Sequence, residues 1–258
     1  MPGQADALWV EDLTVVYEKF PALWNVSCHI PTGSMAAIIG PNGAGKSTFL
    51  KAIMNFIPES SGHVTFFGKG LPEVRSKIAY MPQRSSVLWD FPMTALELVL
   101  MGSYAHKGLF SFLSKKEKAA ALEILEQVDM HTYAHAQIGA LSPGQQQRLF
   151  VGRALFQNPD LYLMDEPFAG VDMATEARLF HIFHELQKKG KTLILVHHQL
   201  DSVEKHFDWV LLLNSSLITS GKTKEVYTEI NLQRAYGKAS YLLEEAINLS
   251  GAKNQGLK

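Results

Sequence analysis

The sequence has a single cysteine, Cys28, so no disulfide can form within the chain. This cysteine lies in the strand-like stretch NVSCHI, where we expect a small buried apolar side chain. No apolar run approaches the ~18–20 residues of a membrane-spanning helix. The longest runs, TLILV and WVLLL, suit short buried strands, and the first residues, MPGQADALWVEDL, lack the features of a secretory signal. We therefore expect a cytoplasmic protein that reaches any membrane through a partner.

The chain also lacks an excess of charge of either sign. Its 258 residues include 24 basic and 25 acidic side chains, for a formal net charge of −1. This balance does not favour a nucleic-acid-binding surface, so no nucleic-acid partner is predicted. A hydrophobic content of 47% is typical of a globular protein, and the length suits one large α/β domain or two small ones.

Short apolar stretches alternate with helical patterns, which favours an α/β fold with a largely parallel sheet covered by helices. The alternation lapses over residues 84–141, which are predicted to form an inserted helical subdomain. Thr94 with Glu97, and Ser114 with Glu117, fit capping boxes at two helix starts there. Residues 226–258 are predicted to form a C-terminal helical appendage. The expected strands are LTVVY, AAIIG, KIAYM, LYLMD, TLILV and WVLLL.

The segment IIGPNGAGKST follows an apolar strand and opens a helical pattern. It satisfies the pattern G-x-x-x-x-G-K-[ST], in which backbone N–H groups surround phosphate oxygens. Lys46 is expected to reach the β- and γ-phosphates, Ser47 to ligate Mg²⁺, and Thr48 to donate to an inner phosphate. The sequence therefore predicts a site for a nucleotide and Mg²⁺ made by Gly40, Pro41, Asn42, Gly43, Ala44, Gly45, Lys46, Ser47 and Thr48.

A second apolar stretch, LYLMD, ends in two consecutive carboxylates, Asp165 and Glu166. Because side chains alternate along a strand, the two carboxylates should point in opposite directions and serve different purposes. Asp165 suits a carboxylate that organises Mg²⁺ beside the phosphate loop from behind the direct ligands of the ion, and Glu166 suits a general base that polarises the attacking water. A solvated acidic turn before Pro167 is the structural alternative.

The stretch ALSPGQQQRLFVGRAL contains a third candidate site. Ser142 suits a helix N-cap, Pro143 the first helical position, and Gln145 the third position of a capping box. A helix start is a sufficient explanation for the motif taken alone. A helix N-terminus with a serine hydroxyl and the Gly144 amide also suits an anion, and this second anion site could serve a nucleotide held mainly by another copy of the protein.

Together these motifs resemble the ATP-binding cassette (ABC) family over residues 8–225. The resemblance implies a P-loop NTPase (RecA-like) core with the inserted helical subdomain and an N-terminal antiparallel β region, as one ABC ATPase domain over residues 1–225. It also implies a head-to-tail homodimer, in which Ser142, Gly144 and Gln145 of one subunit complete the ATP site of the other. Pro143 departs from the family, which usually has glycine there, and proline removes a backbone donor.

Other positions match the family residue by residue. Tyr17 corresponds to the aromatic side chain that stacks on adenine, Gln83 to the glutamine that contacts Mg²⁺ and water, and Asp172 to the loop that crosses the dimer interface. A core tyrosine and a loop glutamine are the structural alternatives for the first two. His198, rather than His197, has the family's spacing to the next aspartate and is assigned to the γ-phosphate contact.

The resemblance further implies how the residues divide the work of hydrolysis. Water attacks the γ-phosphate in line, with Glu166 as base and with Lys46 and His198 among the groups that spread the transition-state charge. The residues implied to organise Mg²⁺ are Ser47, Gln83 and Asp165.

A narrower resemblance concerns the cargo. The stretch MPQRSSVLWDFPMTALELVLMG, with VHHQL and MDEPFAGVD, is similar to ATPase subunits of bacterial transporters for manganese, zinc or iron uptake. This implies transmembrane permease subunits as partners, an extracytoplasmic metal-binding protein acting indirectly, and a peripheral location on the cytoplasmic face of the membrane. An ABC ATPase for another cargo, or a soluble ABC protein acting on ribosomes or nucleic acid, stays an alternative.

Two histidine pairs could suggest that the chain itself binds a metal. His131 and His135 are four residues apart, and His181 and His184 are three apart. Pairs at these spacings can share one face of a helix, but two ligands do not make a closed metal site. We therefore do not expect a transition metal bound to this chain.

Overall fold

The computed structural model describes residues 6–17, 20–57, 60–104 and 114–237. The chain forms two compact units. The first unit comprises Met1–Trp9, Ile30–Met35 and Thr65–His197, and the second comprises Val10–His29, Ala36–Val64 and His198–Lys258.

Three parallel strands form the sheet of the first unit. They are β5 (Ile78–Met81), β6 (Leu161–Met164) and β7 (Thr192–Val196), with β6 in the middle. Leu161 lies opposite Ile78 on one side and Thr192 on the other. Every residue of β6 and β7 is buried, which explains why their sequences are continuous apolar runs rather than alternating patterns.

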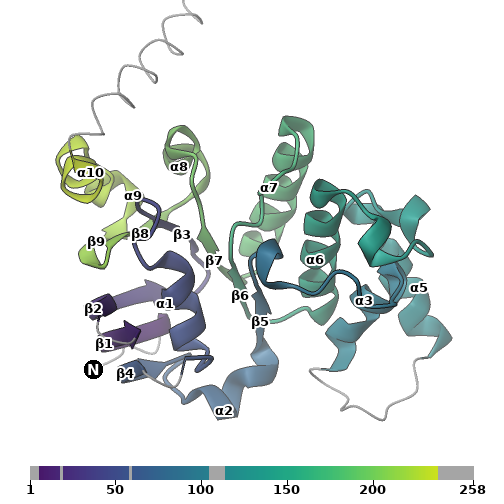
Figure 1. Cartoon of the computed structure of the whole chain (residues 1–258), viewed down its shortest axis with the longest axis horizontal. Helices are drawn as coiled ribbons and strands as arrows, with labels where there is room; N and C mark the ends of the chain where they lie inside the picture. Colours follow the sequence, from purple (N-terminus) through teal and green to yellow (C-terminus); the bar gives the residue numbers. More distant parts are fainter. Residues whose placement is uncertain (1–5, 18–19, 58–59, 105–113, 238–258) are drawn as a thin grey trace, which may run out of the picture. The chain divides into compact units, whose positions relative to one another are not determined.

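Helices make up most of the rest of the first unit, and α3, α5 and α6 pack together as a group (Figure 1). The capping boxes predicted at Thr94 and Ser114 are both present, and each hydroxyl accepts the N–H of the glutamate three residues later. The described part of residues 84–141 is thus mainly helical, with turns between the helices, while the bounds of a separate subdomain stay a prediction. The helices are α2 (Leu71–Val74), α3 (Ala95–Leu100), α5 (Lys115–Gln127), α6 (Pro143–Gln157) and α7 (Met173–Lys188).

Short 3₁₀ helices join these elements. In the first unit they lie at Arg75–Lys77, Arg84–Ser86, Met101–Ser103, His131–Tyr133 and Ile138–Ala140, and in the second unit at Leu200–Ser202.

In the second unit, β3 (Met35–Ile39) runs parallel to β8 (Trp209–Asn214), with Ile38 opposite Leu211. Strand β8 also pairs with β9 (Ser216–Lys222) in the antiparallel sense. Strand β3 is buried along its whole length and leads through a glycine-rich loop into α1 (Lys46–Ile53). The remaining helices of this unit are α8 (Val203–His206), α9 (Thr223–Val226) and α10 (Glu229–Tyr236), and residues 238–258 of the predicted appendage lie outside the described residues.

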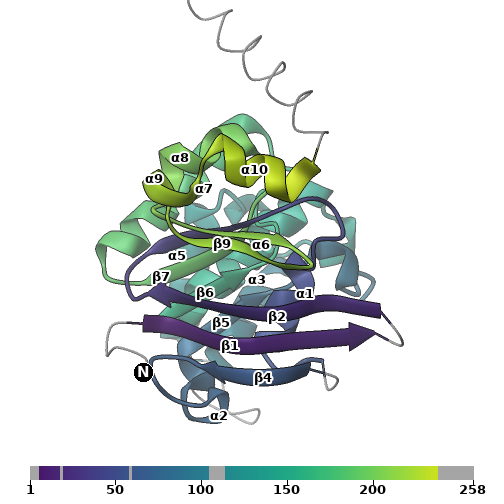
Figure 2. The same ribbon diagram turned by 90° about the vertical axis from the view of Figure 1, so that its left-hand side faces the viewer.

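A second, three-stranded sheet belongs mainly to the second unit. It consists of β1 (Asp6–Tyr17), β2 (Phe20–Pro31) and β4 (Ser60–Thr65), with β1 in the middle (Figure 2). Leu13, Val15 and Leu23 are buried along β1 and β2, with polar residues between them, as a half-buried sheet requires.

All six strands expected from the sequence are present, in β1, β3, β5, β6, β7 and β8. None of the expected strands covers β4 or β9. Their sequences, SSGHVT and SLITSGK, contain glycine and several polar residues, and the side chains in β4 and β9 are mostly exposed or half-buried. Such strands carry little hydrophobic signal, because pairing with a neighbouring strand rather than burial defines them.

Candidate functional site

The phosphate loop, residues 40–48, connects β3 to α1 in the second unit. Gly43 and Gly45 have φ angles of +81° and +89°, a left-handed conformation that residues with a Cβ atom seldom adopt. Gly45 also lies against β2, where an added Cβ would be 2.7 Å from the Ala22 carbonyl oxygen. Glycine at these positions therefore permits the tight backbone curl that a phosphate-binding loop requires.

The hairpin of β8 and β9 supports the phosphate loop. An added Cβ at Gly40 would lie 2.0 Å from the Leu213 carbonyl oxygen, so the two backbones are in contact. The Ser215 N–H donates to the Ala44 carbonyl oxygen at 3.0 Å, and the Ser215 carbonyl oxygen accepts from the Trp24 N–H at 2.7 Å. The turn at Ser215 thus connects the phosphate loop to β2, and no motif in the sequence indicates this support.

Lys46 begins α1, and its side chain is only 6% exposed. Its Nζ donates to the carbonyl oxygens of Gly40 at 2.8 Å and Pro41 at 2.9 Å. These bonds hold the ammonium group against the loop, at the N-terminus of a helix whose partial positive charge also attracts anions. The loop thus combines a lysine cation with a helix start, a combination suited to phosphate oxygens, and Ser47 and Thr48 follow in the first turn of the helix.

Two carboxylates stand at the end of β6 in the first unit. Asp165 is fully buried, and its N–H donates to the Met81 carbonyl oxygen at 2.9 Å, which extends the pairing of β5 with β6 by one residue. Burial and, secondly, the negative charge of Asp165 raise the pKa of the Tyr80 hydroxyl on the neighbouring strand. A buried carboxylate at the carboxyl end of parallel strands is placed where ligands of α/β sheets commonly bind.

Glu166 has a conformation that the sequence did not reveal. Its φ angle is +55°, which is unusual for a residue with a long side chain. Its carbonyl oxygen accepts from the Ala169 N–H at 3.1 Å and from the Gln147 side-chain amide at 2.5 Å. The reversal of the chain therefore begins at Glu166, and the alternation of a regular strand does not extend to its side chain.

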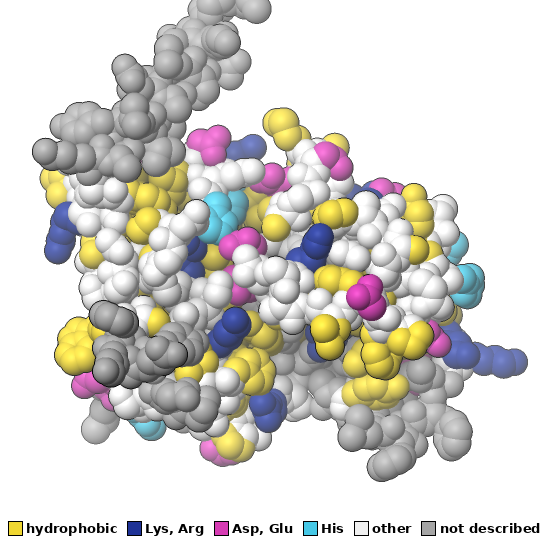
Figure 3. Space-filling view, in the orientation of Figure 1, with side chains coloured by type: hydrophobic (Ala, Val, Ile, Leu, Met, Phe, Trp, Pro, Cys, Tyr) yellow, Lys and Arg dark blue, Asp and Glu magenta, His cyan; other side chains and the backbone are white. Residues whose placement is uncertain are grey.

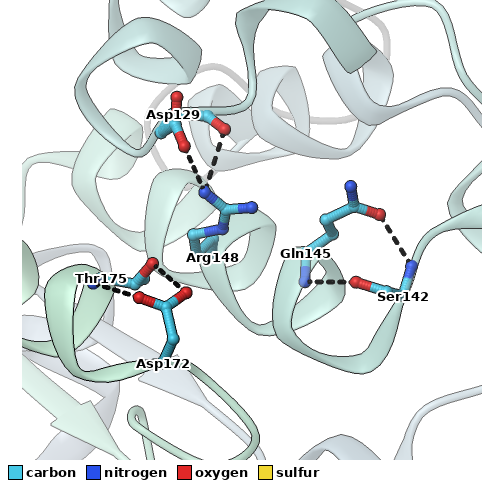
Figure 4. A network of polar contacts seen from close by, with 6 residues as sticks. All are labelled: Asp129, Ser142, Gln145, Arg148, Asp172 and Thr175. Atoms are coloured by element: carbon cyan, nitrogen blue, oxygen red, sulfur yellow. Dashed lines mark hydrogen bonds and ion pairs between the residues drawn. The ribbon is translucent and has the colours of Figure 1, made fainter.

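The N-terminus of α6 carries the predicted capping box. The Ser142 hydroxyl accepts from the Gln145 N–H at 3.3 Å, and the Gln145 side chain accepts from the Ser142 N–H at 2.8 Å (Figure 4). Pro143 occupies the first helical position, as expected. Arg148, one turn further along, forms an ion pair of 2.7 Å with Asp129 beyond the end of α5. The helix start is therefore held by local bonds and by one long-range ion pair.

Asp172 is the N-cap residue of α7. Its carboxylate accepts from the Thr175 N–H and from the Thr175 hydroxyl, both at 2.9 Å (Figure 4). These hydrogen bonds, with the Thr175 N–H as the largest contribution, lower the pKa of Asp172 below its ordinary value. The side chain is exposed, so this carboxylate combines a structural role in the helix with access from outside.

The remaining predicted residues have different surroundings. Gln83 precedes a 3₁₀ helix, and its carbonyl oxygen accepts from the N–H and the hydroxyl of Ser86. His198 is exposed, whereas His197 is 3% exposed and lies edge-on against Phe168 and Phe180. Tyr17 ends β1, but its side chain lies outside the described part of the structure.

Each unit thus holds part of the predicted site. The structure places the phosphate loop and His198 in the second unit, and it brings Glu166 close to the helix that Ser142 begins in the first unit. The roles of these residues toward a nucleotide stay predictions. The contact of Gln147 with Glu166 could not be predicted from the sequence, because a glutamine inside a helix carries no motif of its own.

Mg²⁺ prefers oxygen ligands and usually keeps several waters when it binds a nucleotide. The predicted donors, the Ser47 hydroxyl, the Gln83 amide oxygen and the Asp165 carboxylate, meet this preference. Within the described residues, no group of three or more histidine, cysteine, aspartate or glutamate side chains is arranged to hold a metal ion. The oxygen character of these three predicted donors fits a magnesium ion that also binds phosphates and water.

Comparisons with known proteins agree with this combination of motifs. A protein-family model described as ABC transporter matches residues 23–169. The zinc transport system ATP-binding protein TroB of Treponema pallidum is 52% identical over 90% of this chain and 88% of its own length. The manganese transport system ATP-binding protein MntB of Bacillus subtilis is 47% identical over 95% of this chain and 98% of its own. A solved structure described as the ATP binding subunit of an ABC transporter superposes with a TM-score of 0.76 at 26% identity, over 92% of this chain and 98% of that one.

Proposed function

Because this chain belongs to the ABC transporter family and is an ATP-hydrolysing subunit of it, we propose that it powers the uptake of manganese or zinc through membrane partner subunits. The observation that carries the proposal is the similarity along nearly the whole chain to two relatives named for manganese and zinc transport. The metal is cargo for the membrane partners, and this chain contributes the energy of ATP hydrolysis.

The phosphate loop holds the triphosphate in this proposal. Its curled backbone and the N-terminus of α1 bind phosphate oxygens, and the Lys46 ammonium exchanges its carbonyl partners for the β- and γ-phosphates. Ser47, Gln83 and Asp165 would hold magnesium, which would neutralise part of the phosphate charge. Two observations support these assignments: Asp165 is buried, and hydrogen bonds hold the Lys46 ammonium group against the loop.

Glu166 acts as the general base that takes a proton from the attacking water, and His198 orients the γ-phosphate. Asp165 is fully buried whereas Glu166 is half-buried, and this difference in surroundings supports two different roles for the consecutive carboxylates. Tyr17 is proposed to stack on the adenine ring, as in the family.

A second copy of the chain completes the site. Ser142 is exposed at the N-terminus of the 15-residue helix α6, and its hydroxyl proton can be donated while its oxygen accepts from the Gln145 N–H. Together with Gly144 and Gln145 it would bind the γ-phosphate of the ATP held by the partner, with Asp172 in the interface. The helix N-terminus adds its partial positive charge to this contact.

The membrane partner is a permease. No helix in the described ranges of the chain has the length and apolar character needed to span a bilayer. Hydrophobic side chains gather over the α3 and α5 part of the first unit (Figure 3). On the segments that flank these helices, Leu88, Phe91 and Tyr133 are 87%, 59% and 38% exposed, which suits contact with another protein. We propose peripheral attachment at the cytoplasmic face of the membrane, with an extracytoplasmic binding protein delivering the metal.

Transport tests the proposed cargo directly. The chain is assembled with its membrane partner in lipid vesicles, and uptake of radioactive manganese and zinc is measured with and without ATP. We expect ATP-dependent uptake of at least one of the two metals. ATP hydrolysis with uptake of neither metal would overturn the cargo assignment.

The Glu166→Gln variant tests the base. It should bind ATP as the wild type does, lose about 10²–10⁴-fold in kcat, and accumulate as an ATP-bound dimer, because the amide cannot accept the water proton. Hydrolysis is measured by phosphate release, and the dimer by light scattering after gel filtration. The control is Glu176→Gln, which changes an acidic side chain in the first turn of α7. Hydrolysis by Glu166→Gln at the wild-type rate would show that the assignment is wrong.

A further inference from the structure

Gln147 is a buried polar side chain to which the reaction scheme gives no role. It lies in the second turn of α6 and is 1% exposed. Its side-chain Nε2 donates to the carbonyl oxygen of Glu166 at 2.5 Å, between residues that are 19 positions apart in the chain. A buried amide of this kind is costly unless it is hydrogen-bonded, so its bond to the Glu166 carbonyl oxygen is significant.

The acceptor belongs to a residue with a left-handed backbone conformation. Glu166 has a φ angle of +55°, a conformation in which its Cβ is crowded. Its carbonyl oxygen also accepts the Ala169 N–H at 3.1 Å, which closes the turn that follows β6. A conformation of this kind persists only when its surroundings hold it, and the Gln147 amide is one of the groups that bond to this carbonyl oxygen.

A second contact joins the same two elements. An added Cβ at Gly144 would lie only 2.7 Å from the Gly170 carbonyl oxygen, so the first turn of α6 packs directly on the backbone of the loop after Glu166. Side-chain bulk at this point would push the helix and the loop apart. The N-terminal turns of α6 are therefore in contact with the Glu166 loop at both ends, at Gly170 and at Glu166 itself.

We propose that Gln147 is a positioning residue that couples the orientation of Glu166 to the position of α6, an inference that rests on the base role assigned to Glu166 in the proposed function. The N-terminus of α6 carries Ser142, Gly144 and Gln145, the groups proposed to bind the partner's nucleotide. Movement of the helix on that nucleotide shifts the Gln147 amide, and the amide carries the Glu166 carbonyl and side chain with it. Each subunit thus adjusts its own base when it contacts the ATP of its partner.

The Gln147→Met variant removes the amide and keeps an unbranched side chain of similar length. We expect kcat for ATP hydrolysis to fall at least tenfold, while KM and the affinity for a slowly hydrolysed ATP analogue stay within twofold. We expect kcat to fall without a change in KM or affinity because the variant displaces the Glu166 base but leaves the phosphate loop unchanged. Gln147→Glu is a second variant of nearly the same shape, with an oxygen in place of the NH₂ group, and should show the same split.

Gln146→Met is the matched control. Gln146 is the adjacent residue of α6, is 5% exposed, and donates its side-chain amide to the Ile138 carbonyl oxygen at 3.1 Å, away from the Glu166 loop. Its loss removes a comparable buried hydrogen bond and should leave kcat within twofold of the wild type. Thermal unfolding of all variants is measured alongside.

A double variant distinguishes a role of Gln147 in positioning Glu166 from a general loss of structure. In the Glu166→Gln background, Gln147→Met should change single-turnover hydrolysis by less than twofold, because there is no base left to position. An unchanged kcat in Gln147→Met and Gln147→Glu, an equal fall in Gln146→Met, or an additive effect in the double variant would each overturn the proposal. The metal-uptake assay tests the proposed function separately. If the protein hydrolyses ATP without taking up metal, the cargo assignment fails, but the hydrolysis rates of the glutamine variants still test the role of Gln147.

Discussion

Two glycines of the phosphate loop allow a strict test of how the loop is held. Gly43 and Gly45 have nearly the same φ angle, +81° and +89°. A Cβ added at Gly43 would have no heavy atom within 4 Å, whereas one added at Gly45 would lie 2.5 Å from a Leu23 methyl carbon and 2.7 Å from the Ala22 carbonyl oxygen. Alanine at either position therefore suffers the same backbone strain, but only at Gly45 does it also collide with β2.

The expected magnitudes follow from these two effects. A left-handed conformation costs a residue with a Cβ roughly 1–2 kcal/mol, so Gly43→Ala should lower the free energy of unfolding by about that amount. The collision in Gly45→Ala adds about 1–3 kcal/mol, because the Leu23 side chain can rotate but the Ala22 backbone must move. The smaller entropy of the unfolded chain favours alanine by about 0.4–1 kcal/mol in both variants and cancels in the comparison.

Urea unfolding followed by circular dichroism measures the difference, with the slope checked for equality between the variants. Thermal unfolding should agree, at about 2–4 °C for each kcal/mol in a chain of this size. Equal destabilisation of the two variants would refute the reasoning, because it would mean that contact with β2 does not constrain the loop at Gly45. The outcome does not depend on any assumption about nucleotide binding.

Two further predictions concern charged residues of the site. Lys46→Ala should weaken ATP binding at least tenfold in a fluorescence titration, because it removes the ammonium group that the Gly40 and Pro41 carbonyl oxygens hold. Lys51→Ala, in the last turn of the same helix, is the control. Unchanged affinity in Lys46→Ala would contradict the phosphate-loop assignment. The pKa of Asp172 is lowered by folding, so its cap stabilises α7 at pH values above the ordinary value of 3.8 and loses this effect as the pH falls through the lower folded-state pKa. Asp172→Asn should therefore show a flatter dependence of the melting temperature on pH below about pH 4, and a profile parallel to that of the wild type would contradict this account.

Local sequence predicted the features that depend on neighbouring residues. The capping boxes at Thr94, Ser114 and Ser142 require a hydroxyl and a glutamate or glutamine three residues later, and each forms as expected. The six expected strands are short stretches rich in apolar residues, most of them buried, and this pattern makes them recognisable. The phosphate loop is likewise readable, because its glycine, lysine and serine positions carry the chemistry by themselves.

The features that were not predicted depend on contacts between distant residues. Strands β4 and β9 are defined by pairing, and a polar sequence gives no indication of the neighbour it pairs with. The support of the phosphate loop by Ser215 joins segments that are far apart in the chain. The left-handed conformation of Glu166 is equally invisible, since the residue type disfavours it and only its surroundings hold it.

The sequence by itself was enough to predict the candidate chemical groups of this protein: the phosphate loop, the pair of carboxylates after a buried strand, and the serine that begins α6. These are short patterns in which the identity of each side chain carries the function. Only the tertiary structure decided how the groups are held, through the β8–β9 turn beneath the loop and the Gln147 amide on the Glu166 carbonyl. The physical reason is that a hydrogen bond or a steric contact between residues distant in the chain depends on the packing of whole elements, which no local pattern of side chains specifies.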